Sequence, residues 1–159
     1  NKCDLEISDI KKMTIWGNHS PTMYPDLDNA EIKGESASGW INDQNWIESD
    51  FLRIVQQRGK AIIDARGASS ATSAANAAID TVKATLSETP ADDWFSAAVL
   101  SDGSYNVPEG LIFGFPLKAD ANGKVSIVQD LPISDYAQEK IELTTQELLD
   151  EKNDIKDLL

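Results

Sequence analysis

Apolar residues recur at helical spacing in two adjacent stretches of the chain. In residues 44–66 the spacing is close to that of one helix face, and Gly67 follows the last of these residues. The apolar positions are Ile47, Phe51, Ile54, Val55, Ile62 and Ile63. Residues 69–87 have a second apolar face, rich in alanine, and Ser69 or Ser70 can cap its start. We expect two helices joined almost directly, with the alanine-rich face packed closely against a neighbouring helix.

A third helix is predicted after Pro132, running towards the C-terminus. Ile141, Leu148 and Ile155 recur every seven residues, which indicates one buried face on an otherwise charged helix. Either Ser134 or Thr144 can be its N-cap. Thr144 and Glu147 have the spacing of a capping box.

Shorter apolar runs predict strands. Residues 13–16 form one that Gly17 stops, and a further short strand is indicated at 31–33, before breaks at Gly34 and Gly39. Runs at 94–101, 111–118 and 124–128 follow one another, and the last two are joined by a turn at Asn122-Gly123. The predicted class is α+β: an antiparallel β meander packed with long helices, in one domain covering residues 1–159.

Composition narrows the function classes. The chain has 14 Lys and Arg against 27 Asp and Glu, a net charge of −13, so a broad basic surface for nucleic acid is not expected. No apolar run approaches the ~18 residues of a membrane span, and no secretory leader is evident. The single cysteine, Cys3, excludes an internal disulfide and argues against a cysteine-based zinc site. A reducing, cytoplasmic compartment fits this composition best.

His19 is the one residue whose position suggests catalysis. It lies two residues after Gly17, at a strand end and beside Pro21, and an imidazole exchanges protons near neutral pH. On the residues alone, a surface or packing role is the commoner outcome. Asp26 and Asp28 are near in the chain, but nothing identifies either as its partner. The glycine-rich motifs GxGxxG, GxxxxGK[ST] and GxSxG are absent.

Four strings together resemble malate dehydrogenase, specifically the C-terminal substrate-binding domain of the cytosolic and chloroplast branch of the lactate/malate dehydrogenase family. The strings are IWGNHSPTMYPD (15–26), VQQRGKAIIDARGASSATSAA (55–75), VLSDGSYNVPEGLIFGFP (99–116) and LPISDYAQEK (131–140). They occur in the family's order and spacing. GNHS favours malate over lactate dehydrogenase, for which GEHG is expected.

The resemblance implies reversible hydride transfer between malate and NAD(H), giving oxaloacetate, in a homodimeric enzyme. His19, in GNHS, matches the family's acid/base histidine. Ser69 and Ser70 match a segment at the wall of the substrate pocket. Arg58 matches a helix arginine that is not part of the substrate clamp.

The same resemblance implies that other parts of the site lie outside this chain. The aspartate partner of the histidine and one substrate arginine are expected before residue 1. The remaining arginines and most of the NAD site are expected in a nucleotide-binding domain, so NAD and NADP cannot be separated here. The chain alone is expected to be inactive. Two alternatives stay open: a non-catalytic dimerisation or binding module of this ancestry, and a related enzyme such as lactate dehydrogenase.

Overall fold

Strand β7 (Ile112–Ala119) lies at the centre of the molecule. The computed structural model describes residues 4–158, so the predictions about Cys3 lie outside it. β7 is flanked by β6 (Phe95–Leu100) and β8 (Val125–Ile127), with both pairings antiparallel. The side chains of Phe113, Phe115 and Leu117 are fully buried. This sheet is the predicted meander, and Gly123, at φ +78°, forms the turn between its last two strands.

The remaining strands form two smaller antiparallel sheets near the N-terminus. β2 (Thr14–Trp16) pairs with β3 (Tyr24–Asp26), which confirms the predicted first strand. β4 (Glu31–Ile32) pairs with both β1 (Ile10–Lys11) and β5 (Glu35–Ser36). The expected break at Gly39 is wrong, because Gly39 lies inside α1 (Ala37–Ile41), where its N–H donates to the capping Ser36 hydroxyl.

The predicted helix 44–66 is one helical run with two irregularities. It contains α2 (Gln44–Trp46), a π-helical turn (Ile47–Phe51), α3 (Leu52–Gln56) and α4 (Arg58–Arg66). Gln57 departs from helical geometry between α3 and α4, at φ −98° and ψ 5°. Gly67, at φ +71°, ends the run as predicted, and its N–H donates to the carbonyl of Ile63.

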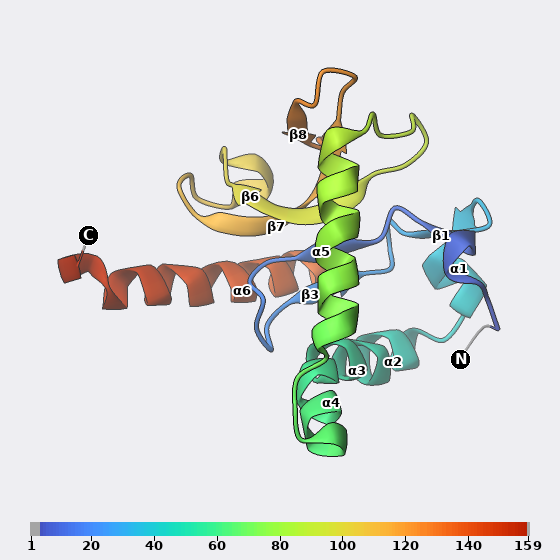
Figure 1. Cartoon of the computed structure of the whole chain (residues 1–159), viewed down its shortest axis with the longest axis horizontal. Helices are drawn as coiled ribbons and strands as arrows, with labels where there is room; N and C mark the ends of the chain where they lie inside the picture. Colours follow the sequence, from blue (N-terminus) through green and yellow to red (C-terminus); the bar gives the residue numbers. More distant parts are fainter. Residues whose placement is uncertain (1–3, 159) are drawn as a thin grey trace.

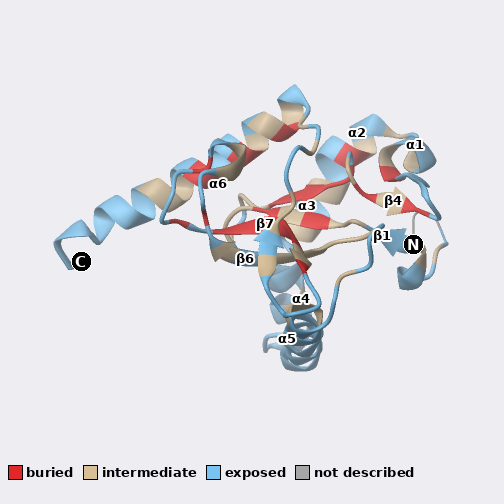
Figure 2. Ribbon diagram, turned by 90° about the horizontal axis from the view of Figure 1, so that it is seen from above, coloured by how far each residue is buried: buried red, intermediate tan, exposed pale blue. Residues whose placement is uncertain are grey.

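Helix α5 (Ala71–Leu86) confirms the second predicted helix but not its packing. In Figure 1 it crosses in front of the middle of the molecule. Figure 2 shows it nearly end-on, at one edge of the molecule and coloured as exposed. No residue of α5 is buried, and Ile79, Val82 and Leu86 are more than half exposed. The expected helix partner for the alanine-rich face is therefore wrong within residues 4–158, since α5 packs on β6 and β7 instead.

Helix α6 (Asp135–Asp154) is the predicted third helix. Ser134 is its N-cap, because its hydroxyl accepts the N–H of Ala137. The alternative cap at Thr144, with Glu147 in a capping box, is wrong, because both residues lie well inside the helix. The buried face begins as expected at Ile141, which is 1% exposed, but it fades to 46% exposure at Ile155.

Two apolar clusters form the core. The larger surrounds β7 and joins it to β2, β3 and α6, and its largest members are Trp16, Phe113, Phe115 and Leu117. The smaller lies beneath β4, α1 and the π-helical turn, and includes Ile32, Ala37 and Ile47. In Figure 2 the buried segments run through the middle of the molecule, away from the outer ends of α5 and α6.

Two glycines allow β2 to cross β7 at close range. Gly17 and Gly114 exchange backbone hydrogen bonds, with N–O distances of 3.3 and 3.0 Å. A Cβ atom on Gly114 would lie 2.6 Å from the carbonyl oxygen of Ile15, too close for any side chain. The crossing therefore requires glycine at position 114.

We predict that Gly114→Ala lowers the free energy of unfolding by about 1–3 kcal/mol, the usual cost of overpacking a core. Gly59→Ala is the matched control, because Gly59 lies in α4 and a Cβ atom added there would have no neighbouring atom within 4 Å. This control should gain about 0.4–1 kcal/mol through the entropy of the unfolded chain. Urea denaturation of both variants measures the difference, and equal stability of Gly114→Ala and the parent would contradict the close crossing.

Candidate active site

The β2–β3 hairpin carries the segment that contains His19. Its register pairs Thr14 with Asp26 and Trp16 with Tyr24, and residues 17–23 connect the two strands. All four paired side chains are buried. The connecting segment therefore projects from two strands whose paired side chains are fixed in the core.

Asp26 stabilises the paired strands of the hairpin, and its carboxylate is occupied by donors other than His19. Its side chain is fully buried, and its carboxylate accepts Trp16 Nε1–H at 3.0 Å. The same carboxylate accepts the backbone N–H groups of Asp28 and Asn29 and the Asn29 side-chain amide. Every one of these donors is local to the hairpin or the turn after it, so Asp26 has a structural role.

Asp28, the other acid near His19 in the chain, is also engaged elsewhere. Its side chain is exposed and accepts the Ser134 hydroxyl at 2.9 Å. Neither acid makes a hydrogen bond or ion pair with His19 in the part of the chain that the structure describes.

Thr144 anchors the start of the His19 loop to helix α6. Its hydroxyl oxygen accepts the backbone N–H of Asn18 at 2.9 Å. Gly17, at φ +96°, passes so close that a Cβ atom there would overlap the Thr144 side chain. The loop can leave β2 in this direction only because residue 17 has no side chain.

Glu147, one turn further along α6, binds the next part of the loop. Its Oε2 accepts Asn18 Nδ2–H at 3.1 Å, the Ser20 hydroxyl at 2.5 Å and the Thr22 hydroxyl at 2.6 Å. The other amide hydrogen of Asn18 is donated to Glu151. At the far end of the loop, Gln56 of α3 donates its side-chain N–H to the carbonyl of Met23 at 2.9 Å.

The pKa of the Glu147 carboxyl lies below its usual value. Partial burial acts to raise it, but the hydrogen bonds from Ser20, Thr22 and Asn18 together outweigh that effect. The carboxylate is therefore ionised across the neutral range.

His19 itself lies on the exposed side of this loop. Its side chain is exposed, and it takes part in no hydrogen bond or ion pair within residues 4–158. An imidazole held on an ordered loop and open to its surroundings can exchange a proton with a bound molecule.

Ser69 and Ser70 lie in the short connection between α4 and α5. Ser69 is exposed and Ser70 half-buried, and the carbonyl of Ser69 accepts Arg66 Nη1–H at 3.0 Å. Ser70 occupies the N-cap position of α5, but its hydroxyl makes no capping hydrogen bond. The described residues contain no hydrogen bond that joins either serine to His19.

The arginines of the 44–66 helical run are surface residues. Arg53 pairs with Asp50 at 2.8 Å, and Arg58 is exposed at the first position of α4. The hydrogen bonds and ion pairs of residues 4–158 bring none of the three arginines to His19.

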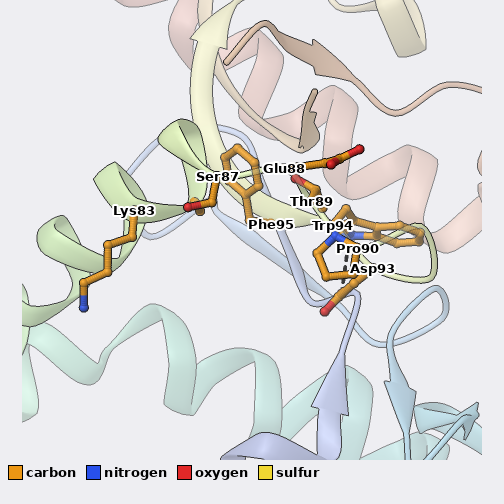
Figure 3. Close-up of a pocket in the computed structure, with 9 residues that line it drawn as sticks. Lys83, Ser87, Glu88, Thr89, Pro90, Asp93, Trp94 and Phe95 are labelled. Carbon is orange, nitrogen blue, oxygen red and sulfur yellow. Dashed lines mark hydrogen bonds between the residues drawn. The ribbon is translucent and has the colours of Figure 1, made fainter. Parts of the chain in front are cut away.

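A separate cavity lies where α5 meets β6 (Figure 3). It measures about 340 Å³, and Lys83, Glu88, Pro90 and Trp94 are among its lining residues. None of the residues expected to act in catalysis lines it. No group of three or more metal-ligating side chains is assembled in residues 4–158, and no helix there is long and apolar enough to cross a membrane.

Comparison with known proteins decides the family. The profile of the lactate/malate dehydrogenase, alpha/beta C-terminal domain matches residues 1–159. The chain belongs to the lactate/malate dehydrogenase family.

Solved structures from this family superpose closely on the chain. Malate dehydrogenase from Naegleria fowleri is 41% identical, with a TM-score of 0.91 over 99% of this chain. Lactate dehydrogenase from Trichomonas vaginalis, solved with NADH and oxamate, is 28% identical, with a TM-score of 0.87 over 96% of this chain. In each case the chain spans 48% of the other protein, so it matches about half of a dehydrogenase polypeptide.

The residues that sequence reasoning missed are Thr144 and Glu147. Their threonine-x-x-glutamate spacing was visible but is equally typical of a helix start. Only the fold shows that the two side chains face a loop more than 120 residues away in the sequence.

We predict that Thr144→Val destabilises the chain more than Thr145→Val. The first change removes the acceptor of the part-buried Asn18 N–H, and loss of a typical intramolecular hydrogen bond costs about 0.5–1.5 kcal/mol. Thr145 is the matched control, because its hydroxyl donates only to the carbonyl of Ile141 in its own helix. Thermal unfolding of the two variants tests this, and equal losses would argue against a specific role for Thr144.

Proposed function

We propose that this chain is the C-terminal half of an NAD-dependent dehydrogenase that interconverts malate and oxaloacetate. The observation that carries the proposal is the placement of His19: exposed, on a loop tied to the core at both ends, within the family's GNHS string. The identity to a malate dehydrogenase, 41%, against 28% to a lactate dehydrogenase, supports malate as the substrate. The GNHS string and the other three motifs support the cytosolic and chloroplast branch. The composition supports a cytoplasmic location.

His19 supplies the proton transfer of the proposed reaction. Its imidazole gives a proton to the carbonyl oxygen of oxaloacetate or takes one from the hydroxyl of malate. Ser69 and Ser70 are proposed to line the substrate pocket, and their position in an exposed connection supports this. We propose, as the family resemblance implies, that the orienting carboxylate and the arginine clamp come from outside this chain. Neither Asp26 nor Asp28 bonds His19, and this supports the proposal.

NAD does not fit the residues of this chain by themselves. The dinucleotide-binding fold needs parallel strands joined by helices, whereas every strand pairing in residues 4–158 is antiparallel. The nicotinamide, when bound, accepts or returns the hydride. We propose that a separate nucleotide-binding domain holds it.

The activity test compares the complete dehydrogenase polypeptide with this chain alone, by NADH oxidation in the presence of oxaloacetate. We predict that His19→Asn lowers kcat by roughly 10²–10⁴-fold, the usual contribution of a positioned acid/base. The 159-residue chain alone should be silent, because it lacks the cofactor site.

Three other outcomes would contradict parts of this proposal. Robust NADH oxidation by the chain alone would contradict the division of the site between two domains. Faster turnover of pyruvate than of oxaloacetate would assign lactate as the substrate. A silent complete protein would favour a binding module that keeps only the ancestry of the family.

The exposed face of α5 supports the proposal of a homodimer in the intact enzyme. Ile79, Val82 and Leu86 are 54%, 56% and 76% exposed and lie three or four residues apart. These spacings place them on one side of the helix. Such a face is stabilised when another surface covers it.

We predict that the chain alone associates as its concentration rises, because burial of this face removes apolar surface from water. A Val82→Lys/Leu86→Lys double variant should associate less. Leu143→Lys is the control, because Leu143 is similarly exposed but lies on α6. Sedimentation velocity over a range of concentrations measures the effect. A clean monomer with a sharp high-temperature melt would argue against a covered α5 face.

A further inference from the structure

Three side chains of the His19 loop converge on a single carboxylate oxygen. Asn18, Ser20 and Thr22 all donate to Oε2 of Glu147. These three residues are half-buried, whereas His19 and Pro21 between them are exposed. The loop therefore turns alternate side chains towards α6, and His19 is held from the residue before it and from the residue after it.

The contacts of Glu147 are those of an ionised acceptor. The hydroxyls of Ser20 and Thr22 both donate to its Oε2, and hydrogen bonds to a carboxylate are about twice as strong as neutral ones. Glu147 makes no ion pair within the described residues. Its charge is thus balanced by donors of the loop and not by a lysine or arginine.

Hydrogen bonds within the loop also hold its turn. The N–H of Thr22 donates to the Ser20 hydroxyl, and the N–H of Met23 donates to the carbonyl of Ser20. The Ser20 hydroxyl is thereby fixed as a donor to Glu147 and an acceptor from Thr22. Removal of the Glu147 carboxylate would take away the acceptor that Asn18, Ser20 and Thr22 share. The loop would keep its backbone turn, its bonds to Thr144, and the contacts with Glu151 and Gln56.

We propose that Glu147 is a positioning residue, whose carboxylate fixes loop 18–22 so that the His19 imidazole is presented in one orientation. The effect of Glu147 on catalysis rests on the proposed function. Its effect on the order of the loop does not, because both the loop and Glu147 belong to this chain. It adds to the site a residue of the C-terminal helix that does not touch the substrate.

The first experiment measures loop order in the 159-residue chain. The chain has one histidine, so every imidazole NMR signal comes from His19 and needs no residue assignment. We expect Glu147→Leu to lower the backbone ¹⁵N order parameters of residues 18–20 and 22, which have an amide hydrogen, and to broaden or shift the imidazole signals. Glu147→Gln keeps an acceptor oxygen without the charge and should give a smaller change. Glu142→Gln is the matched control, because Glu142 is exposed on the same helix and accepts only from Gln138.

A second variant changes the loop instead of α6, so that the proposal stays testable if Glu147→Leu does not fold. Ser20→Ala/Thr22→Val removes the two short donors and leaves α6 intact. It should loosen the loop as Glu147→Leu does. If Glu147→Leu does not fold, this double variant decides the result. Order parameters that match the parent in this double variant, or in a folded Glu147→Leu, would overturn the proposal.

The second experiment measures kinetics in the complete dehydrogenase polypeptide. We expect Glu147→Leu to lower kcat roughly 10–100-fold, the cost of a misplaced catalytic group, with the KM for NADH unchanged. Glu147→Gln should recover part of the loss, and Glu142→Gln should match the parent. Equal kcat for Glu147→Leu and the parent would refute the claim that Glu147 positions His19 for catalysis. An inactive parent would instead refute the proposed function, and the NMR result would still decide whether Glu147 orders the loop.

Discussion

The close crossing of the β2–β3 hairpin over strand β7 is the constraint on which the rest of the structure depends. It places Gly17 against Gly114 and brings the hairpin between the central sheet and α6. Any side chain at position 114 would separate the two layers. Once the hairpin is seated, Trp16 enters the core and donates its indole N–H to buried Asp26, and the loop that carries His19 emerges facing α6.

The loop is fixed by polar contacts because its location leaves little apolar surface to bury. Its anchors are Thr144 and Glu147 on α6 and Gln56 on α3, and each binds a backbone or side-chain group of residues 18–23. Polar anchoring also keeps His19 away from the core. A histidine packed among apolar side chains would be harder to protonate, because burial disfavours the charged form.

Much of the fold could be predicted from the order of apolar and turn residues. The meander, the helical run ended by Gly67 and the Ser134 cap all follow from local rules, and the structure confirms them. Local rules failed at Gly39 and at the apolar face of α5. Gly39 suits a break but sits in a helix, and the face of α5 has the pattern of a buried face but is exposed.

The candidate site could be predicted only in part, because residues far away in the sequence hold its loop. His19 was identified from its motif, and its exposed position on the loop fits that role. Its supports were not identified, because threonine and glutamate three residues apart within a helix have no distinctive pattern. The pairing of Glu147 with Ser20 and Thr22 is a tertiary fact, and no periodicity in either segment encodes it.

The distance in sequence between the loop and its anchors bears on how such a site can be moved between proteins. The donors lie at residues 18–22 and their acceptors at residues 144–147, separated by more than 120 positions. A short GNHS peptide grafted onto another hairpin would therefore carry the imidazole but none of the groups that hold it. The smallest portable unit is the hairpin together with the middle of the last helix, on a backbone that keeps the two in contact.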